Sequence, residues 1–177
     1  MVRNVHERLY ETRLNAAEAG ALLIDQLAGR DDAMWPREEW PPVRFDRPLG
    51  VGARGGHGPV RYTVEEYVPG RGVAFRFTAP RGFVGSHGFE VEQSAPGVVR
   101  VRHTLLMRLE GWARLSWPLV YRWLHDALVE DALDRAGASI GCAPARRAVW
   151  SRWVRVLRKA LRLSHGLSRH ARRQAAA

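Results

Sequence analysis

The sequence of 177 residues lacks several features that define common protein classes. It holds one cysteine, Cys142, so neither a disulfide nor a thiolate cluster for zinc can form within one chain. Its longest apolar runs fall far short of the roughly 20 residues that span a bilayer. The charged start, residues 1–14, has no apolar core of the kind found in signal peptides. We therefore expect a cytoplasmic protein with one ordinary domain and an appendage.

Acidic residues are missing from the last part of the chain. Residues 1–140 hold 18 Arg against 18 Asp plus Glu, whereas residues 141–177 hold nine Arg, one Lys and no acid. The net charge of +10 therefore belongs to the C-terminal end. Because net charge informs about partners and not about fold, we divide the chain into a domain over residues 1–140 and a tail over residues 141–177.

Residue patterns predict the order of elements in the domain. Residues 2–14 have the alternation of a strand, and Asn15 with Glu18 resembles a capping box before a helix over residues 16–28. Residues 30–48 contain Trp-Pro steps that exclude a regular helix, and their tryptophans are expected to seal a core edge. Strand-like segments follow at 59–68, 72–79, 84–92 and 98–110. A last helix begins near Ser116, which can cap it, with Pro118 in its first turn.

Period-two alternation divides the four strand-like segments into a covered and a wet face. Apolar residues, together with His87 and His103, share the covered face, while most arginines and glutamates lie on the other. The alternation breaks at residues 65–67. We interpret this break as a β-bulge in preference to a buried catalytic Glu66.

This order of elements resembles the helix-grip fold of the START-like superfamily, also called SRPBCC or polyketide cyclase/dehydrase-like proteins. The resemblance covers roughly residues 2–138 and is carried by Asn4-Val5-His6-Glu7-Arg8, Gly50-Val51-Gly52, the segment from Tyr62 to Arg71, Gly88-Phe89-Glu90-Val91 and the last helix. It implies an α+β fold in which a curved antiparallel sheet wraps a long C-terminal helix. It also implies an apolar cavity between them, used in that superfamily for lipids, polyketides, plant hormones or quinones. Enzymes are a minority there, no catalytic residue is common to them, and basic tails are not part of the pattern.

Two short motifs match known chemistry but stand in the wrong context. Gly50-x-Gly52-x-x-Gly55 spells a dinucleotide fingerprint, yet a strand follows it instead of a phosphate-binding helix, so we expect a glycine-rich hairpin or loop. The run 137–141, Gly-Ala-Ser-Ile-Gly, spells a nucleophile elbow, but a helix precedes it where a strand is required. Neither a Walker motif nor a His-Glu-x-x-His motif occurs. We predict no metal and no cofactor.

A pair of histidines is the most specific polar feature of the covered face. If Val91 pairs with Val99 across the turn, His87 lies directly opposite His103, with Cβ atoms about 5 Å apart. Neutral imidazoles offer one donor and one acceptor each, which suits a carbonyl, phenol or carboxylate of a ligand. Contact with a ligand and mutual satisfaction within the core are equal alternatives.

From the residues and the resemblance we expect a small hydrophobic ligand bound between sheet and helix. The predicted ligand-binding residues are Tyr62, Phe75, Phe77, His87, Phe89, Val101, His103, Met107 and Trp123. Ordinary core packing is the alternative for each aromatic residue. The alternative function is a polyketide cyclase, aromatase or dehydratase with the histidines or Tyr62 as acid and base. We assign no catalytic residue.

The tail is predicted to contain an amphipathic helix, since residues 146–163 place apolar and basic residues on opposite halves of a helical wheel. Such a helix suits an anionic membrane surface. The predicted membrane-binding residues are Trp150, Arg152, Trp153, Arg155, Lys159 and Arg162. Docking of the apolar half on the domain, or on a second copy of the chain, is an equal alternative, and the acids of the preceding helix would aid it: Asp126, Glu130, Asp131 and Asp134. Nucleic-acid binding through phosphates ranks behind both.

Overall fold

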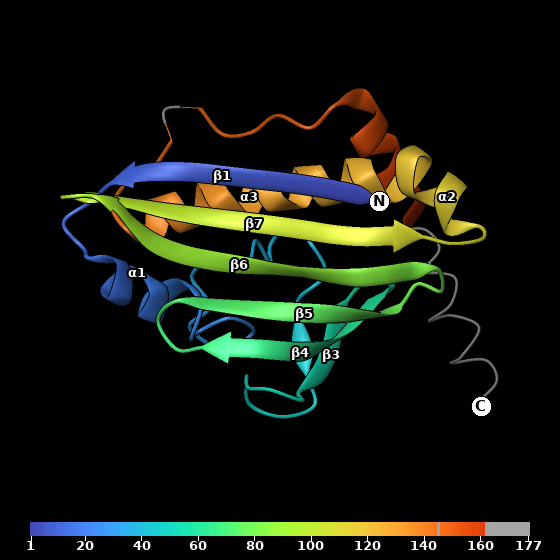
Figure 1. The fold of residues 1–177 in the computed structure, drawn as a ribbon. Coiled ribbons are helices and arrows are strands. Elements are labelled where there is room, and N and C mark those ends of the chain that lie inside the picture. The colour runs from blue at the N-terminus through green and yellow to red at the C-terminus, as the bar shows by residue number, and fades with distance from the viewer. Residues whose placement is uncertain (145, 162–177) are drawn as a thin grey trace, which may run out of the picture.

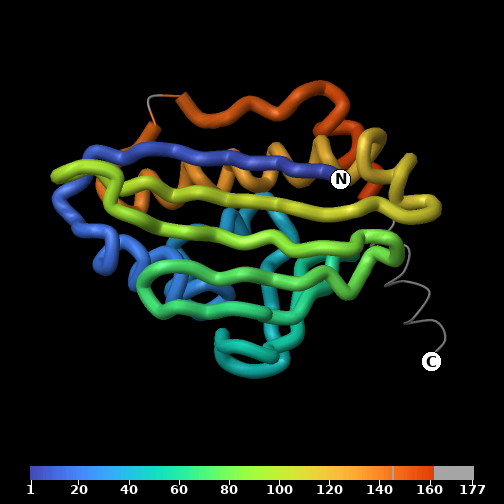
Figure 2. Tube along the Cα trace, in the orientation of Figure 1, coloured from blue at the N-terminus to red at the C-terminus, as the bar shows by residue number. Residues whose placement is uncertain are grey.

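The computed structural model describes residues 1–144 and 146–161 as a curved sheet that wraps a long helix (Figure 1, Figure 2). The sheet is antiparallel, with seven strands in the order β1-β7-β6-β5-β4-β3-β2. The strands are β1 (Val2–Glu11), β2 (Arg44–Phe45), β3 (Arg54–His57), β4 (Val60–Val68), β5 (Gly72–Ala79), β6 (Phe83–Ala95) and β7 (Val98–Leu109). The predicted strand and meander are confirmed, and β1 lies at the edge beside β7.

One face of the sheet is buried and the other is wet, as the alternation predicts. Val64, Phe75 and Val101 are buried, whereas Arg61 and Glu65 are exposed. The pairing of β4 with β5 shifts between residues 64 and 66, which confirms the predicted bulge. The glycine-rich stretch leads into the β3–β4 hairpin and not into a helix, so no dinucleotide fingerprint is formed.

The predicted register between β6 and β7 is wrong by two residues. Phe89 pairs with His103, and His87 pairs with Leu105. The register shifts at residues 93–95, close to the turn, where the sequence pattern carries no signal of an irregularity. Because a shift of two residues keeps each side chain on its own face, both histidines still lie on the covered side, now as diagonal neighbours.

Helix α1 (Ala16–Leu23) starts where predicted and ends earlier. Asn15 accepts a hydrogen bond from the backbone N–H of Glu18, and the Glu18 carboxylate accepts one from the backbone N–H of Asn15, so the capping box is confirmed. The helix packs so tightly against the β4–β5 turn that a Cβ on Gly20 would lie 1.8 Å from the carbonyl oxygen of Gly70. After residue 23 the chain continues in turns, and Ala28 adopts a positive φ of 64° that a helix excludes.

The segment after α1 closes one edge of the core with its tryptophans, as expected. Trp35 and Trp40 are both buried. The carboxylate of Asp32 holds the preceding turn, because it accepts hydrogen bonds from the backbone N–H groups of Ala28, Met34 and Trp35.

The helix that covers the sheet begins before Ser116. It consists of α2 (Ala113–Ser116), the π-helical turn η1 (Trp117–Tyr121) and α3 (Arg122–Ser139). Ser116 makes no side-chain cap, so the predicted start is wrong. Pro118 lies near the start of the π-helical turn, and its missing N–H is tolerated where the hydrogen-bond ladder changes from one helix type to the next.

The described part of the tail docks on the domain. Residues 152–161 form a helix that lies beside α2 and the start of α3 (Figure 1). Val154 and Arg158 are buried in this contact. The Arg158 guanidinium lies 4.3 Å and 3.6 Å from the ring centroids of Trp40 and Trp150. Arg162 lies outside the described residues, and a domain boundary after residue 140 stays a prediction.

Candidate ligand-binding site

An apolar cavity of about 130 Å³ lies between the sheet and the covering helix. Its wall includes Phe77 and His87 from the sheet and Tyr121 and His125 from the helix. Leu161 of the tail helix also lines it. The cavity is therefore built from the sheet, the covering helix and the docked tail.

Two of the nine predicted ligand-binding residues, Phe77 and His87, line this cavity. The predicted residues that are buried elsewhere in the core are Tyr62, Phe75, Phe89, Val101, His103 and Met107. Contrary to expectation, Trp123 lies outside the cavity wall and is 45% exposed. The wall positions 117, 120, 121, 124, 125 and 128 recur at helical spacing, and residue 123 falls off that face.

Five histidines form a row across the interior of the described chain. His57, which follows the glycines of β3, and His87 both line the cavity. The Nδ1 atom of His87 lies 3.3 Å from Nε2 of His103, whose ring centroid lies 5.0 Å from that of His125. The centroid of His6 lies 6.0 Å from that of His125, on the far side of the row. Only His87 and His103 were predicted to meet.

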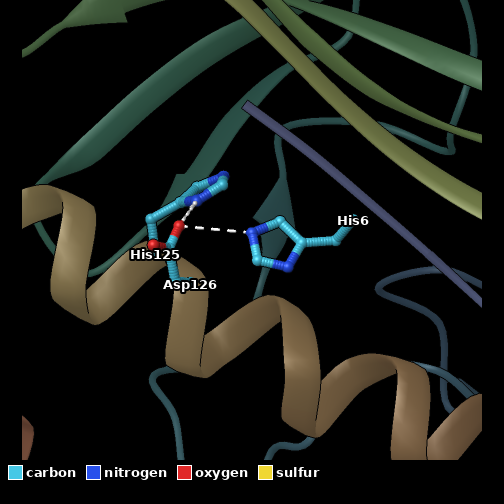
Figure 3. A group of neighbouring side chains, drawn as sticks. All are labelled: His6, His125 and Asp126. Carbon is cyan, nitrogen blue, oxygen red and sulfur yellow. Dashed lines mark hydrogen bonds and ion pairs between the residues drawn. The ribbon is translucent and has the colours of Figure 1, made fainter. Parts of the chain in front are cut away.

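Asp126 holds the end of this row in place (Figure 3). Its Oδ1 atom accepts hydrogen bonds from Asn4 Nδ2 at 2.9 Å, from His125 Nδ1 at 3.1 Å and from His6 Nε2 at 3.2 Å. Burial opposes the ionisation of Asp126, but these hydrogen bonds outweigh it and hold the pKa of Asp126 below its usual value. Asp126 is therefore a carboxylate that only accepts hydrogen bonds.

His6 is the cationic member of the row. Hydrogen bonds to Asp126 and Glu130 raise the pKa of His6 to about 9, against an opposing effect of burial. Glu130 also pairs with Arg8, which contacts Asp134 as well, so this network joins β1 to α3. Ligand atoms of His6, His125 and Asp126 lie within 4.8 Å of one another, close enough for one metal ion. Since the hydrogen bonds to Asp126 account for this grouping, we assign it to the network, and the absence of a metal site stays a prediction.

The hydrogen bond to Asp126 fixes which nitrogen of His125 carries the proton. Burial lowers the pKa of His125, so its ring is neutral, and the carboxylate partner requires the proton to sit on Nδ1. Nε2 therefore carries a bare lone pair. This atom is buried, and no hydrogen-bond partner is found for it among the described residues. His125 thus offers an acceptor in the wall of an apolar cavity.

His87 and His103 share one hydrogen bond between neutral rings. Burial holds the pKa of both histidines well below the usual value. His87 Nε2 and His103 Nδ1 are buried without a partner in the described part of the chain. Either position of the shared proton leaves one unpaired N–H, on His87 Nε2 or on His103 Nδ1. Because an unpaired buried N–H is rare and only His87 lines the cavity, where a ligand can accept from it, we assign the shared proton to His103 Nε2. His87 Nε2–H then offers a donor in the cavity wall.

His57, His125, Asp126 and His6 were not predicted as site residues from the sequence. His125 carried a readable signal, because it falls on the same helical face as the apolar residues 117, 121, 124 and 128. Asp126 could then have been chosen as its neighbour. His6 and His57 required the pairing of β1 and β3 with their neighbours, which the alternation alone does not specify.

No protein-family model and no curated protein sequence matches the chain. Among solved structures, it is similar to a protein from Thermobifida fusca, with a TM-score of 0.59 and 14% identity over 84% of this chain and 100% of that chain. It is similar to CalU16 from Micromonospora echinospora, with a TM-score of 0.51 and 13% identity over 90% and 83%. The third likeness is to the di-domain ARO/CYC StfQ from the steffimycin biosynthetic pathway, with a TM-score of 0.50 and 11% identity over 79% and 51%.

The chain has the START-like helix-grip fold. At these identities the likeness establishes the architecture alone. No helix in residues 1–144 or 146–161 combines the length and the apolar character needed to cross a bilayer.

Proposed function

We propose that the chain binds a small, mainly apolar molecule that carries both a hydroxyl group and a carbonyl oxygen. The observation that supports this proposal is the pair of buried imidazole nitrogens, His87 Nε2 and His125 Nε2, in the wall of one apolar cavity. One is assigned as a donor and the other as an acceptor. Apolar pockets with a few convergent polar groups are typical ligand sites, and buried polar atoms without a partner are rare in proteins.

The size of the cavity narrows the class of ligand. A cavity of about 130 Å³ resembles the engineered cavities of roughly 150 Å³ that hold benzene. It lies below the range of about 300–1,000 Å³ common for larger ligands. A single ring with oxygen substituents therefore matches this state. A lipid or a multi-ring polyketide would require the displacement of wall residues such as Trp40 and Leu161.

The proposal is tested by measuring the affinity of three single-ring probes by calorimetry. The probes are 4-hydroxybenzaldehyde, benzaldehyde and toluene. Loss of one buried hydrogen bond weakens binding by about tenfold. We expect His125→Leu to weaken the binding of 4-hydroxybenzaldehyde by that factor, relative to the binding of toluene. The same variant should leave the affinity for benzaldehyde, relative to that for toluene, unchanged. We expect His87→Leu to weaken both aldehydes relative to toluene.

Toluene corrects for the change in cavity shape, and Trp123→Leu, on the outer side of the same helix, serves as the matched control. The proposal fails if the wild-type chain binds none of the three probes. It also fails if the histidine variants weaken the binding of toluene as much as the binding of 4-hydroxybenzaldehyde.

A second candidate function is acid–base catalysis of the cyclase or dehydratase type, and the carboxylate behind His125 favours it. An imidazole fixed by a carboxylate is a common general base. Its Nε2 would take a proton from the carbon beside a ketone and become an imidazolium, while the hydrogen bond from His87 Nε2–H stabilises the enolate oxygen that forms. One fold neighbour is an ARO/CYC protein, and this class of reaction begins with such a step.

Deuterium exchange distinguishes catalysis from binding alone. The probe is phenylacetone in D₂O, with incorporation at the carbon between ring and carbonyl followed by NMR. The catalytic candidate requires exchange above that of free imidazole at equal concentration. It also requires that Asp126→Asn lowers the exchange rate by about tenfold or more while the probe still binds. Exchange no faster than with imidazole would leave the binding function alone.

A further inference from the structure

The covering helix presents apolar side chains on two sides, and only the inner side is explained by the cavity. The outer side carries large hydrophobic residues that are between 45% and 77% exposed. They are Trp112, Leu115, Leu119 and Trp123 from the covering helix and the turn before it, with Trp153 and Val156 from the tail helix. We call these six residues the outer patch. Contiguous exposed apolar surface of this kind is uncommon on soluble proteins and indicates an interaction site.

The two parts of the outer patch lie side by side. The indole Nε1 of Trp153 donates to the backbone carbonyl of Leu119 at 2.9 Å, which fixes the tail helix against η1. The indole Nε1 of Trp123 donates to the carbonyl of Pro118 at 3.0 Å. Both indole N–H groups are thus satisfied within the protein. Trp123 and Trp153 therefore present apolar ring surface that needs no polar partner.

The segments that carry the outer patch hold basic residues and no acid, and the acids that flank residues 111–125, Glu110 and Asp126, are paired with basic side chains. Residues 111–125 hold two arginines and no acid, and residues 146–161 hold five arginines, one lysine and no acid. Arg114, Arg152, Arg155 and Lys159 are exposed. Helices that lie in the headgroup region of a membrane typically combine tryptophan and leucine with arginine and lysine.

We propose that the outer patch rests on an anionic membrane surface, with the cationic residues around it in contact with lipid phosphates. Trp150 donates to Asp131 and Arg158 is buried, so these two residues serve docking, and the membrane contact passes to the outer patch. Exposed leucine and valine give no advantage in binding nucleic acid, whereas they gain free energy in the acyl boundary. The proposal does not depend on what the cavity binds, and its failure would leave the proposed function intact.

Vesicle flotation of the full chain tests the proposal. We compare pure phosphatidylcholine vesicles with vesicles that contain about a third phosphatidylglycerol, since each arginine near an anionic surface contributes about fivefold in affinity. Wild type should float with the anionic vesicles and be released between about 0.1 M and about 0.5 M salt. Arg152→Gln/Arg155→Gln should weaken binding by about 25-fold. Leu115→Ser/Leu119→Ser should weaken it by about tenfold or more.

Matched controls use residues of the same type on the sheet. Leu9→Ser removes an exposed leucine of β1, and Arg108→Gln removes an exposed arginine of β7, so neither should change flotation. Circular dichroism checks that each variant is folded. The proposal is overturned if wild type does not float, or if Leu9→Ser acts like the leucine variants. It is also overturned if light scattering shows that Leu115→Ser/Leu119→Ser dissociates a dimer while flotation stays the same. The outer patch would then be a contact between two copies of the chain.

Discussion

Lowering the pH from 6.5 to about 5 is expected to remove several kcal/mol from the free energy of unfolding. The main cause is three neutral, largely buried histidines, His57, His87 and His103, and His125, whose pKa burial also lowers, adds to the same loss. Burial lowers the pKa of His57 to about 3 and holds those of His87 and His103 well below the usual value. The unfolded chain takes up protons at these sites below pH 6.5, whereas the folded chain does not. Their contribution is thus fully present above pH 6.5 and lost as the pH falls, and it rivals the whole stability of many domains.

Urea unfolding at several pH values between 6.5 and about 5 measures this loss, and two variants show where it comes from. His103→Gln removes one of the three groups and should reduce the slope by about a third. His6→Gln is the matched control, because His6 has a pKa of about 9 in the folded chain and is protonated in both states below pH 6. It should lower stability without changing the slope. A flat profile for the wild type would contradict the burial of the three rings.

The covered face of the sheet could be predicted because it depends only on the parity of each position along a strand. His87 and His103 met even though the predicted register was wrong by two residues, since an even shift preserves the face. An odd shift would have separated them. The irregularity at residues 93–95 lies in the chain's own turn geometry, and hydrophobic alternation carries no information about it.

The helix faces were harder to predict because their phase depends on backbone details. The π-helical turn η1 and the start of the helix at residue 113 change which side chains point inward. Trp117 and Tyr121 thereby line the cavity, while Trp123 lies outside it. A helical wheel drawn from Ser116 with uniform spacing cannot show this change.

The tail posed a different problem, since its amphipathic pattern fitted docking and membrane binding equally well. The deciding residue belongs to α3. Asp131 accepts hydrogen bonds from the indoles of Trp40 and Trp150, at 2.7 Å and 2.8 Å. Nothing in the spacing of these three residues, 40, 131 and 150, indicates that they meet. The sequence could point to the acids of the last helix as a group, Asp131 among them, but not to Asp131 alone or to its two indole donors.

Replacement of Asp131 by alanine should therefore release the tail helix, with a loss of about 3 kcal/mol in the free energy of docking. Both indole N–H groups would lose their acceptor, and the buried Arg158 would lose an opposing charge that lies near it. Cleavage by trypsin at Arg158, which is buried in the docked helix, reports the open fraction, and it should accelerate by about 100-fold. A red shift of tryptophan fluorescence should accompany it, as Trp40 and Trp150 become wet.

Glu38→Ala is the matched control for this prediction, because Glu38 pairs with Arg135 at 2.8 Å but is largely exposed. An exposed pair contributes about 1 kcal/mol or less, and Glu38→Ala should leave the rate of cleavage nearly unchanged. Equal rates for wild type and Asp131→Ala would show that the tail is held without the carboxylate. Release also bears on the cavity, since Trp40 and Leu161 both line it. If the docked tail limits access, the hydroxylated probe should associate faster with Asp131→Ala than with Glu38→Ala, and Asp131 then couples docking of the tail to entry of the ligand.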